Sequence, residues 1–296
     1  MKKIEIRSFT YPRRSSDFCI HEMREQDGKT FAISGVIDTI GKPPRRHVTK
    51  AVKMINRVIA DVVSEKNITD LNSLDSRFCE ELTKVNALVR EIGEKEHIFG
   101  FCVLFIVRIN NSVRIHWMGD CRAYHFSWEL DEDSGKQGCR VKALTRDNNT
   151  LTSKLMEVEE NEDQESFELM KNELLELSRQ LKLYMGISND ENFAQEIARQ
   201  TISLELDEDD ALLLMTDGMY MPIVRHNIAN TNFHLTMDMH YLEDWFALYI
   251  DNGNYLLNHD GVERWDALAR DIRKSCIKYT NTKHRYRDDM AVIVTN

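Results

Sequence analysis

The sequence lacks the features that mark membrane and secreted proteins. No stretch of about 18 apolar residues occurs, so no segment is predicted to be a transmembrane helix. The N-terminal segment MKKIEIRSFTYPRRSSD carries charge but no apolar core, which argues against a secretory signal peptide. We therefore expect a cytoplasmic protein that does not use a membrane.

Basic residues are too few for a surface that binds nucleic acid. The chain has 39 Lys and Arg against 49 Asp and Glu, a formal net charge of -10 and a pI near 5.5. Domains that bind polyanions usually present a basic face. The composition argues against a nucleic-acid partner and agrees better with a metal site built from carboxylates. The sequence does not indicate an oligomeric state.

Cysteine pairs of the CxxC kind are also absent. The chain has six cysteines, and several of them lie within apolar runs, where small core residues are expected. We interpret them as reduced, structural residues rather than as metal ligands or redox groups. They are Cys19, Cys79, Cys102, Cys121, Cys139 and Cys276.

The chain is long enough for one sizeable hydrophobic core. It has 296 residues, of which 42% are hydrophobic, and one large domain is as reasonable as two at this length. We interpret residues 1–296 as a single domain. Two helices in succession followed by several strands do not form a regular βαβ repeat, so the pattern predicts an α+β fold.

Hydrophobic periodicity locates the main helices and strands. Apolar residues at three-and-four spacing predict a helix from Arg46 and a second from about Asp75, its N-cap, to Gly93, its C-cap. Asn110 and Asn111 are predicted to join two strands of a hairpin, because Asn tolerates positive φ. Further helices are predicted at 156–180 and 262–276, and strands at 29–37, 99–109, 113–126, 201–206, 211–216 and 290–295, with one more before Thr145.

Three aspartates lie where an apolar, strand-like run meets a turn. They are Asp38 in GVIDTIG, Asp217 in LLLMTDGM and Asp288 in RDDMAVIV. Strand ends are rigid mounts for functional side chains, so three such ends could bring three carboxylates together. Clustered like charges repel one another unless metal ions neutralise them. Oxygen ligands select hard ions such as Mg²⁺ and Mn²⁺, and no His lies in the three motifs.

Seven motifs occur in an order typical of one enzyme family. They are FAISGVIDTIGK, IFGFCVLFIV, VRIHWMGDCRAYHF, ALTRDNNT, LYMGISND, DDALLLMTDGMY and RDDMAVIVT. The series resembles the type-2C metal-dependent serine/threonine protein phosphatases, particularly the bacterial ones, over nearly the whole chain. The resemblance implies a four-layer αββα sandwich of two antiparallel sheets flanked by helices, with the metals in a cleft at one end. Residues 219–258 would be the variable flap region.

The resemblance also implies roles for single residues. Asp38 would bridge two metal ions and Thr39 would offer its backbone carbonyl, while Asp217 and Asp288 would hold one ion. Two further aspartates also have matches in the family. Asp147 would help to bind a third, weaker ion, and Asp17 would act through metal-bound water. Not every acidic residue is assigned to the metals: Asp120 and Arg122 are expected to tie strand ends by hydrogen bonds, and Asp289 is expected to point away from its neighbour Asp288.

The first motif departs from the family pattern Asp-Gly-x-Gly-Gly. The chain has Asp38-Thr39-Ile40-Gly41-Lys42, so two glycines are replaced, and the His of some members is Ile40. A β-branched Thr39 can present its carbonyl only if φ is negative, and its side chain takes space that a Gly would leave open. Activity is therefore expected to be reduced or narrowed.

An Arg just before the N-terminal acidic residue holds the substrate phosphate in this family. Arg13 and Arg14 both qualify here, since a guanidinium can grip a phosphate with two parallel hydrogen bonds. The flanking residues of the family are not reproduced, so a solvated basic turn is the alternative.

Together these features predict a Mn²⁺- or Mg²⁺-dependent phosphatase for phosphoserine and phosphothreonine in proteins. Two ions, and a third at Asp147, would neutralise the phosphoryl oxygens and activate water. The alternative from another class is a non-catalytic pseudophosphatase that binds a phosphoprotein or another partner. A third interpretation is a hydrolase for small phosphorylated metabolites, which would share the metals but differ in cleft shape.

Overall fold

The computed structural model describes most of the N-terminal two thirds of the chain and the last strand. The described residues are 4–11, 16–41, 43–96, 99–130, 137–150, 152–154, 180–186, 190–208, 210–221, 243, 246, 267, 270–271, 274 and 289–296.

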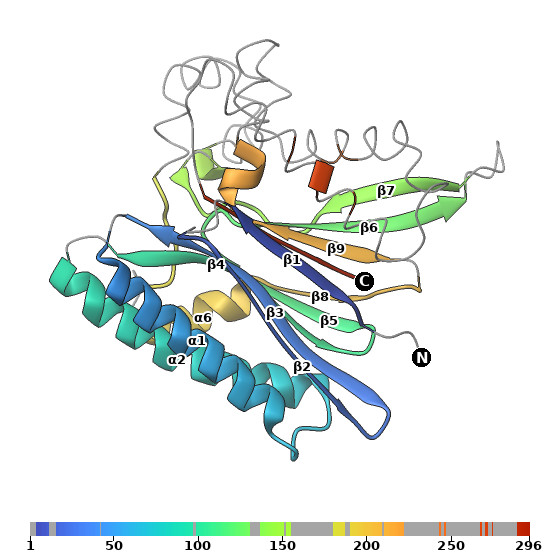
Figure 1. Ribbon diagram of the computed structural model, residues 1–296, viewed down its shortest axis with the longest axis horizontal. Helices are drawn as coiled ribbons and strands as arrows, with labels where there is room; N and C mark the ends of the chain where they lie inside the picture. The colour runs from blue at the N-terminus through green and yellow to red at the C-terminus, as the bar shows by residue number, and fades with distance from the viewer. Residues whose placement is uncertain are drawn as a thin grey trace, which may run out of the picture.

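Two five-stranded antiparallel sheets face each other (Figure 1). One sheet has the order β2-β3-β4-β5-β8. Its strands are β2 (Phe18–Gln26), β3 (Lys29–Ile40), β4 (Gly100–Ile109), β5 (Ser112–Met118) and β8 (Thr201–Glu205). The other has the order β1-β10-β9-β6-β7. Its strands are β1 (Ile6–Tyr11), β10 (Met290–Thr295), β9 (Ala211–Met215), β6 (Arg122–Leu130) and β7 (Gln137–Ala143).

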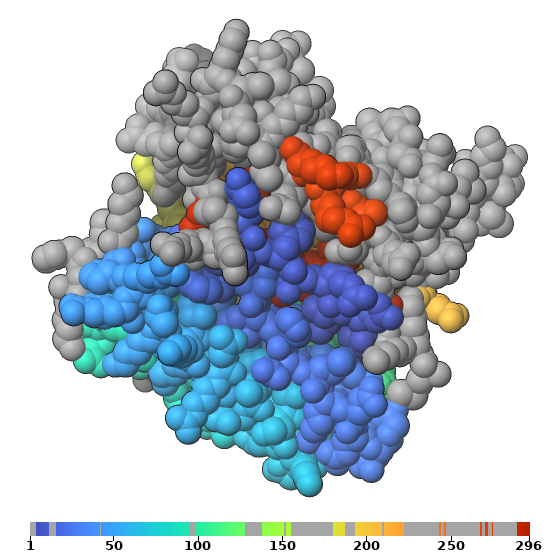
Figure 2. All heavy atoms as spheres, viewed as in Figure 1, coloured from blue at the N-terminus to red at the C-terminus, as the bar shows by residue number. Residues whose placement is uncertain are grey.

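Three helices cover the outer face of the first sheet. They are α1 (Arg45–Ser64), α2 (Leu71–Glu96) and α6 (Asp190–Arg199), and Figure 1 shows them on the side of that sheet away from the second one. Each is amphipathic: the apolar residues of α1 from Val48 to Val63 recur at helical spacing and are buried. In the space-filling view, α1, α2 and the β2–β3 hairpin form one continuous surface (Figure 2).

Side-chain alternation along β3 and β4 separates the two halves of the core. Ile33 and Ile37 of β3 pack in the cluster that includes α1 and α2, whereas Val36 packs in the cluster between the two sheets. Phe105 and Leu104 of β4 divide in the same way. Since successive side chains of a strand point to opposite faces, Asp38 shares the face of Val36 and points between the sheets.

Two of the predicted elements have different boundaries in the structure. The helix predicted from Asp75 begins one turn earlier, because Asp70 is the residue whose carboxylate accepts hydrogen bonds from the Ser73 amide (3.0 Å) and hydroxyl (2.7 Å). Gly93 lies inside α2 rather than after it. The long strand predicted over 113–126 is interrupted at Gly119, whose φ is +95°, so that β5 and β6 belong to different sheets. Asn110 does take positive φ, as predicted.

The predicted α+β sandwich of two antiparallel sheets with flanking helices is confirmed. All of the helix predicted at 156–180 except Gln180, and nearly all of the predicted flap at 219–258, lie outside the described residues. Of the helix predicted at 262–276, the structure describes Ala267, Arg270, Asp271 and Lys274, and all four are helical. Among the described helices, none combines the length and the hydropathy needed to span a membrane.

Candidate metal centre

Asp38 lies near the end of β3, where the strand faces the second sheet. Its Cα is paired with that of Cys102 on β4. The Asp38 carboxylate, the Cys102 thiol and the Asp120 carboxylate each have an atom within 4.8 Å of the others. Two central strands therefore hold Asp38 rigidly at the edge of the space between the sheets.

The turn between β5 and β6 delivers Asp120 to the same place. Gly119 allows this close approach, because a Cβ at this position would lie 2.3 Å from the Cys102 Sγ and the φ of +95° disfavours other residues. The Asn148 side chain fixes the turn by accepting a hydrogen bond from the Gly119 amide (2.9 Å). The Asp120 Oδ1 is buried and accepts no hydrogen bond within the described part of the chain.

The N-terminal segment brings Asp17 to the cluster. The Ser16 hydroxyl and amide both donate to Asp289 Oδ2, the former over 2.5 Å, and the Thr39 hydroxyl donates to the Ser16 carbonyl over 2.6 Å. These contacts join the segment before β2 to the end of β3 and to the residue before β10. Asp17, the next residue, is 2% exposed and is an electrostatic neighbour of Asp38.

Asp217 follows β9, the central strand of the second sheet. The backbones of Thr216 and Ala291 continue the pairing of β9 with β10 through a Thr216 amide hydrogen bond of 3.1 Å, and the Thr216 hydroxyl accepts from the Ala291 amide over 2.9 Å. This double link fixes the strand end from which Asp217 projects. Its negative charge acts on Asp38.

Desolvation and mutual repulsion both act on this cluster, which we call the acidic cluster: Asp17, Asp38, Asp120 and Asp217. Asp38 is half-buried, yet desolvation raises the pKa of its carboxyl well above the ordinary range, and the charges of the other three raise it further. Burial, with Asp147 adding to it, raises the pKa of Asp120 to about 6. Burial and the same carboxylates raise the pKa of the Cys102 thiol, so Cys102 stays neutral.

A buried ion pair borders the acidic cluster. Arg122 at the start of β6 donates to both oxygens of Asp147, over 2.8 and 2.7 Å. Its guanidinium lies 3.9 Å from the centre of the Tyr220 ring, and the Tyr220 hydroxyl donates to the Asp120 carbonyl over 2.7 Å. These contacts of Arg122 and Tyr220 hold the turn after β9 against the turn before β6. Both Asp147 oxygens accept from Arg122, and the predicted role of Asp147 toward a third ion stays a prediction.

The altered first motif keeps the backbone shape that a metal ligand needs. Thr39 and Ile40 continue β3 opposite Phe101 and Gly100, and neither has positive φ. Gly41, the glycine of the motif that is retained, is the one with positive φ, at +83°. The Thr39 hydroxyl contacts the Ser16 backbone. By strand alternation its side chain lies on the face opposite to Asp38.

The structure brings together three of the predicted site residues, Asp17, Asp38 and Asp217. Asp288, Arg13 and Arg14 lie outside the described residues, and their roles stay predictions. Asp120 was expected to have only a structural role, yet it belongs to the acidic cluster. Its signal in the sequence is the one that Asp217 also shows, an Asp beside a Gly next to an apolar run.

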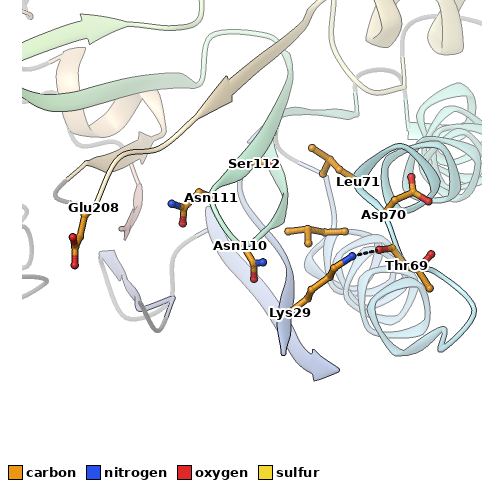
Figure 3. A pocket seen from close by; sticks show the side chains of 9 residues that line it. Lys29, Thr69, Asp70, Leu71, Asn110, Asn111, Ser112 and Glu208 are labelled. Carbon is orange, nitrogen blue, oxygen red and sulfur yellow. Dashed lines mark hydrogen bonds between the residues drawn. The ribbon is translucent and has the colours of Figure 1, made fainter. Parts of the chain in front are cut away.

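A pocket among the described residues lies far from this centre. It has a volume of about 740 Å³, and Figure 3 shows Lys29, Asp70, Asn110 and Glu208 around it. Lys29 starts β3 and Asp38 lies nine residues further on, a distance of about 30 Å along an extended strand. The Lys29 ammonium donates to the Thr69 carbonyl over 3.0 Å. This pocket is therefore no part of the acidic cluster.

The raised pKa of Asp120 predicts how the metal-free protein responds to pH. The folded state keeps a proton on Asp120 up to about pH 6, whereas the unfolded chain loses it near the ordinary value of 3.8. Because the folded state then binds more protons, its free energy of unfolding falls as the pH rises through this window, by roughly 3 kcal/mol for a shift of this size.

Urea unfolding in chelator should show this loss. Between about pH 4 and pH 7, the wild type should lose stability relative to Asp120→Asn. A constant difference between the two proteins across that range would contradict the described electrostatics.

Comparison with known proteins supports the fold. No protein-family model matches the sequence, and no curated protein matches it. Solved structures match over nearly the whole chain. The serine/threonine phosphatase Stp1 of Staphylococcus aureus is 12% identical with a TM-score of 0.60, over 99% of this chain and 95% of that one. PppA, described as a key regulatory component of T6SS in Pseudomonas aeruginosa, is 14% identical with a TM-score of 0.57, over 100% and 98%.

A third structure of this group was solved with metal. The catalytic domain of the serine/threonine protein phosphatase PstP, in complex with two manganese ions, is 14% identical with a TM-score of 0.55, over 99% of both chains. The matches confirm the resemblance predicted from the motifs: the chain has the fold of the type-2C bacterial serine/threonine phosphatases.

Proposed function

We propose that the chain is a Mn²⁺- or Mg²⁺-dependent phosphatase that removes phosphate from phosphoserine and phosphothreonine in cytoplasmic proteins. One observation carries the proposal. Carboxylates from four separate segments are electrostatic neighbours at one end of a phosphatase fold, and desolvation together with the charges of the other three raises the pKa of Asp38. A protein gains no stability from such repulsion, so the cluster is best explained as a binding site for cations.

The donor set fits hard divalent cations. All four members of the acidic cluster offer carboxylate oxygens, and the nearby Cys102 is a neutral thiol. One Asp120 oxygen is buried and accepts no hydrogen bond from the residues that the structure describes. Such sites suit Mg²⁺ or Mn²⁺, which keep several waters and need few protein ligands. The two manganese ions in PstP, which shares the fold, support the same choice.

Each residue has a part in the proposed reaction. Asp38, Asp217 and Asp288 would hold the ions, with the Thr39 carbonyl as a further ligand, Asp17 acting through water and Asp147 at a third ion. When bound, the ions would neutralise charge on the phosphoryl oxygens and activate water for attack. Arg13 or Arg14, three or four residues before Asp17, would hold the phosphate of the phosphoprotein with charge-assisted hydrogen bonds.

The replaced glycines favoured a pseudophosphatase as the alternative. The structure weakens that argument, because Thr39 and Ile40 occupy ordinary strand conformations and the retained Gly41 supplies the positive φ. A metal-loaded but inactive protein remains the outcome that would support the pseudophosphatase. Hydrolysis of small phosphorylated metabolites, with no hydrolysis of phosphopeptides, would support the third interpretation.

The proposal predicts manganese-dependent hydrolysis of a phosphothreonine peptide and of an aryl phosphate, which chelation abolishes and added Mn²⁺ restores. Malachite-green detection of released phosphate measures both substrates. Asp61→Asn is a suitable control, because this carboxylate lies on the exposed face of α1 with a side chain 68% exposed. The control should retain wild-type rates. Full activity of the wild type in excess chelator would overturn the metal dependence.

A further inference from the structure

A second group of metal-binding side chains lies outside the acidic cluster, between α2 and β5. Asp75 and Cys79 are four residues apart and so share one face of α2, opposite His116 on β5. One ligand atom from each lies within 4.8 Å of the others. His116 is 2% exposed and Asp75 is 8% exposed, while Cys79 is half-buried.

The hydrogen bonds around His116 fix which ring nitrogen carries a proton. The Thr201 hydroxyl lies 2.8 Å from the Ile197 carbonyl, which can only accept, so Thr201 must donate its single proton there. The His116 Nδ1, 3.0 Å from the same hydroxyl, must then be the donor in their contact. The neutral form of His116 therefore carries its proton on Nδ1 and presents a lone pair on Nε2.

That lone pair faces a carboxylate at short range. The His116 Nε2 lies 2.5 Å from Asp75 Oδ1 and 4.0 Å from the Cys79 Sγ. Two lone pairs cannot approach so closely without something positive between them. In the absence of metal, a proton must lie between His116 Nε2 and Asp75 Oδ1. Burial, together with the charge of Asp75, raises the pKa of the Cys79 thiol to about 12, so the thiol stays neutral.

We propose that Asp75, Cys79 and His116 form a zinc site that fastens α2 to the first sheet. Carboxylate, thiolate and imidazole are the ligands that Zn²⁺ takes, three protein ligands leave a fourth position for water, and the sulfur discriminates against Mg²⁺ and Mn²⁺. This proposal differs from the sequence interpretation of Cys79 as a structural residue.

The geometry and the charges both permit the exchange of protons for zinc. With bond lengths of about 2.0–2.3 Å, tetrahedral ligand atoms lie roughly 3.4–3.6 Å apart. Nε2 and Oδ1 would separate by about 1 Å, and Nε2 and Sγ would approach by about 0.5 Å. Zinc enters as two protons leave, one from the Asp75–His116 pair and one from the thiol, so the net charge is unchanged.

Outer contacts already orient two of the three ligands. Arg114 donates to Asp75 Oδ2 over 2.7 Å, which leaves Oδ1 to face His116. Thr201 holds the far nitrogen of the imidazole. Metal-ligating His residues usually have such a partner, which sets the ring orientation. The proposal depends on these contacts alone and holds whether or not the acidic cluster is catalytic.

Cobalt titration of the full chain tests the site. Co²⁺ replaces Zn²⁺ in such sites, and only a thiolate ligand gives a sulfur-to-cobalt charge-transfer band. The titration is run in excess Mg²⁺, which occupies the carboxylate-only centre. We expect the band in the wild type and in Cys102→Ser, whose sulfur lies beside Asp38, and its loss in Cys79→Ser. Zinc affinity should fall at least about a hundredfold in Cys79→Ser.

A measurement on the wild type covers the case in which Cys79→Ser does not fold. Zinc should protect Cys79 from alkylation by iodoacetamide, read by mass spectrometry, while the half-buried Cys139 on β7 is alkylated equally with and without zinc. The absence of a charge-transfer band, a band that persists in Cys79→Ser, or equal alkylation of Cys79 with and without zinc would each overturn the proposal.

Discussion

Asp38→Asn should abolish phosphate release while making the metal-free protein more stable. The substitution removes an anionic ligand, and losing several kcal/mol of transition-state stabilisation lowers kcat/KM by about a thousandfold or more. The same change removes one charge from the acidic cluster, whose members raise the pKa of Asp38. The Tm in chelator should therefore rise, because an amide can donate to the neighbouring carboxylates.

The opposite signs of these two effects make the test specific. Substitution of a residue that only supports the fold would lower the stability and the activity of the protein together. Steady-state kinetics with Mn²⁺ and thermal unfolding in chelator give the two readings. If Asp38→Asn lowers the metal-free Tm, or retains more than a tenth of wild-type activity, Asp38 is not at the centre of a metal site.

Arg122→Met should destabilise the fold by about 3–5 kcal/mol, the usual cost of leaving one partner of a buried ion pair alone. Arg122 is 5% exposed, and its guanidinium donates two hydrogen bonds to Asp147. Although burial works against its charge, Asp147 raises the pKa of Arg122 well above its usual value. Without Arg122, the Asp147 carboxylate would add an uncompensated charge next to Asp120.

Arg57→Met is the matched control for this change. Arg57 pairs with Asp61 at 3.6 Å on the surface of α1, with side chains 83% and 68% exposed, and such pairs contribute about 0.3–0.5 kcal/mol at most. Urea unfolding of both variants gives the comparison. Equal free energies of unfolding for Arg122→Met and Arg57→Met would show that the Arg122–Asp147 pair does not hold the two turns together.

The sequence predicts the part of the centre that lies on strands. Asp38 and Asp217 end apolar runs that are central strands in the structure, so local pattern and tertiary position agree. From the sequence, Asp120 is expected to have a structural role, because a turn residue can support the fold or belong to the site. The close approach of Gly119 to Cys102 is what places Asp120 in the acidic cluster. No local sequence pattern predicts the contact between Gly119 and Cys102.

Asp75 shows the limit of helix signals in the sequence. An Asp before an apolar periodic run is a good N-cap, but Asp70 makes the capping hydrogen bonds and Asp75 contacts His116, 41 residues further along the chain. The periodicity of α2 is the same for either start. The partner across the sheet interface, rather than the helix itself, determines what Asp75 does.

The most direct test of the central claim is anomalous diffraction from crystals grown with manganese. We expect two Mn²⁺ peaks at the end of the sandwich, with Asp38 a ligand to both and Asp217 a ligand to at least one. Manganese that binds only away from Asp38 and Asp217, or no manganese peak at the acidic cluster at millimolar concentration, would contradict the account.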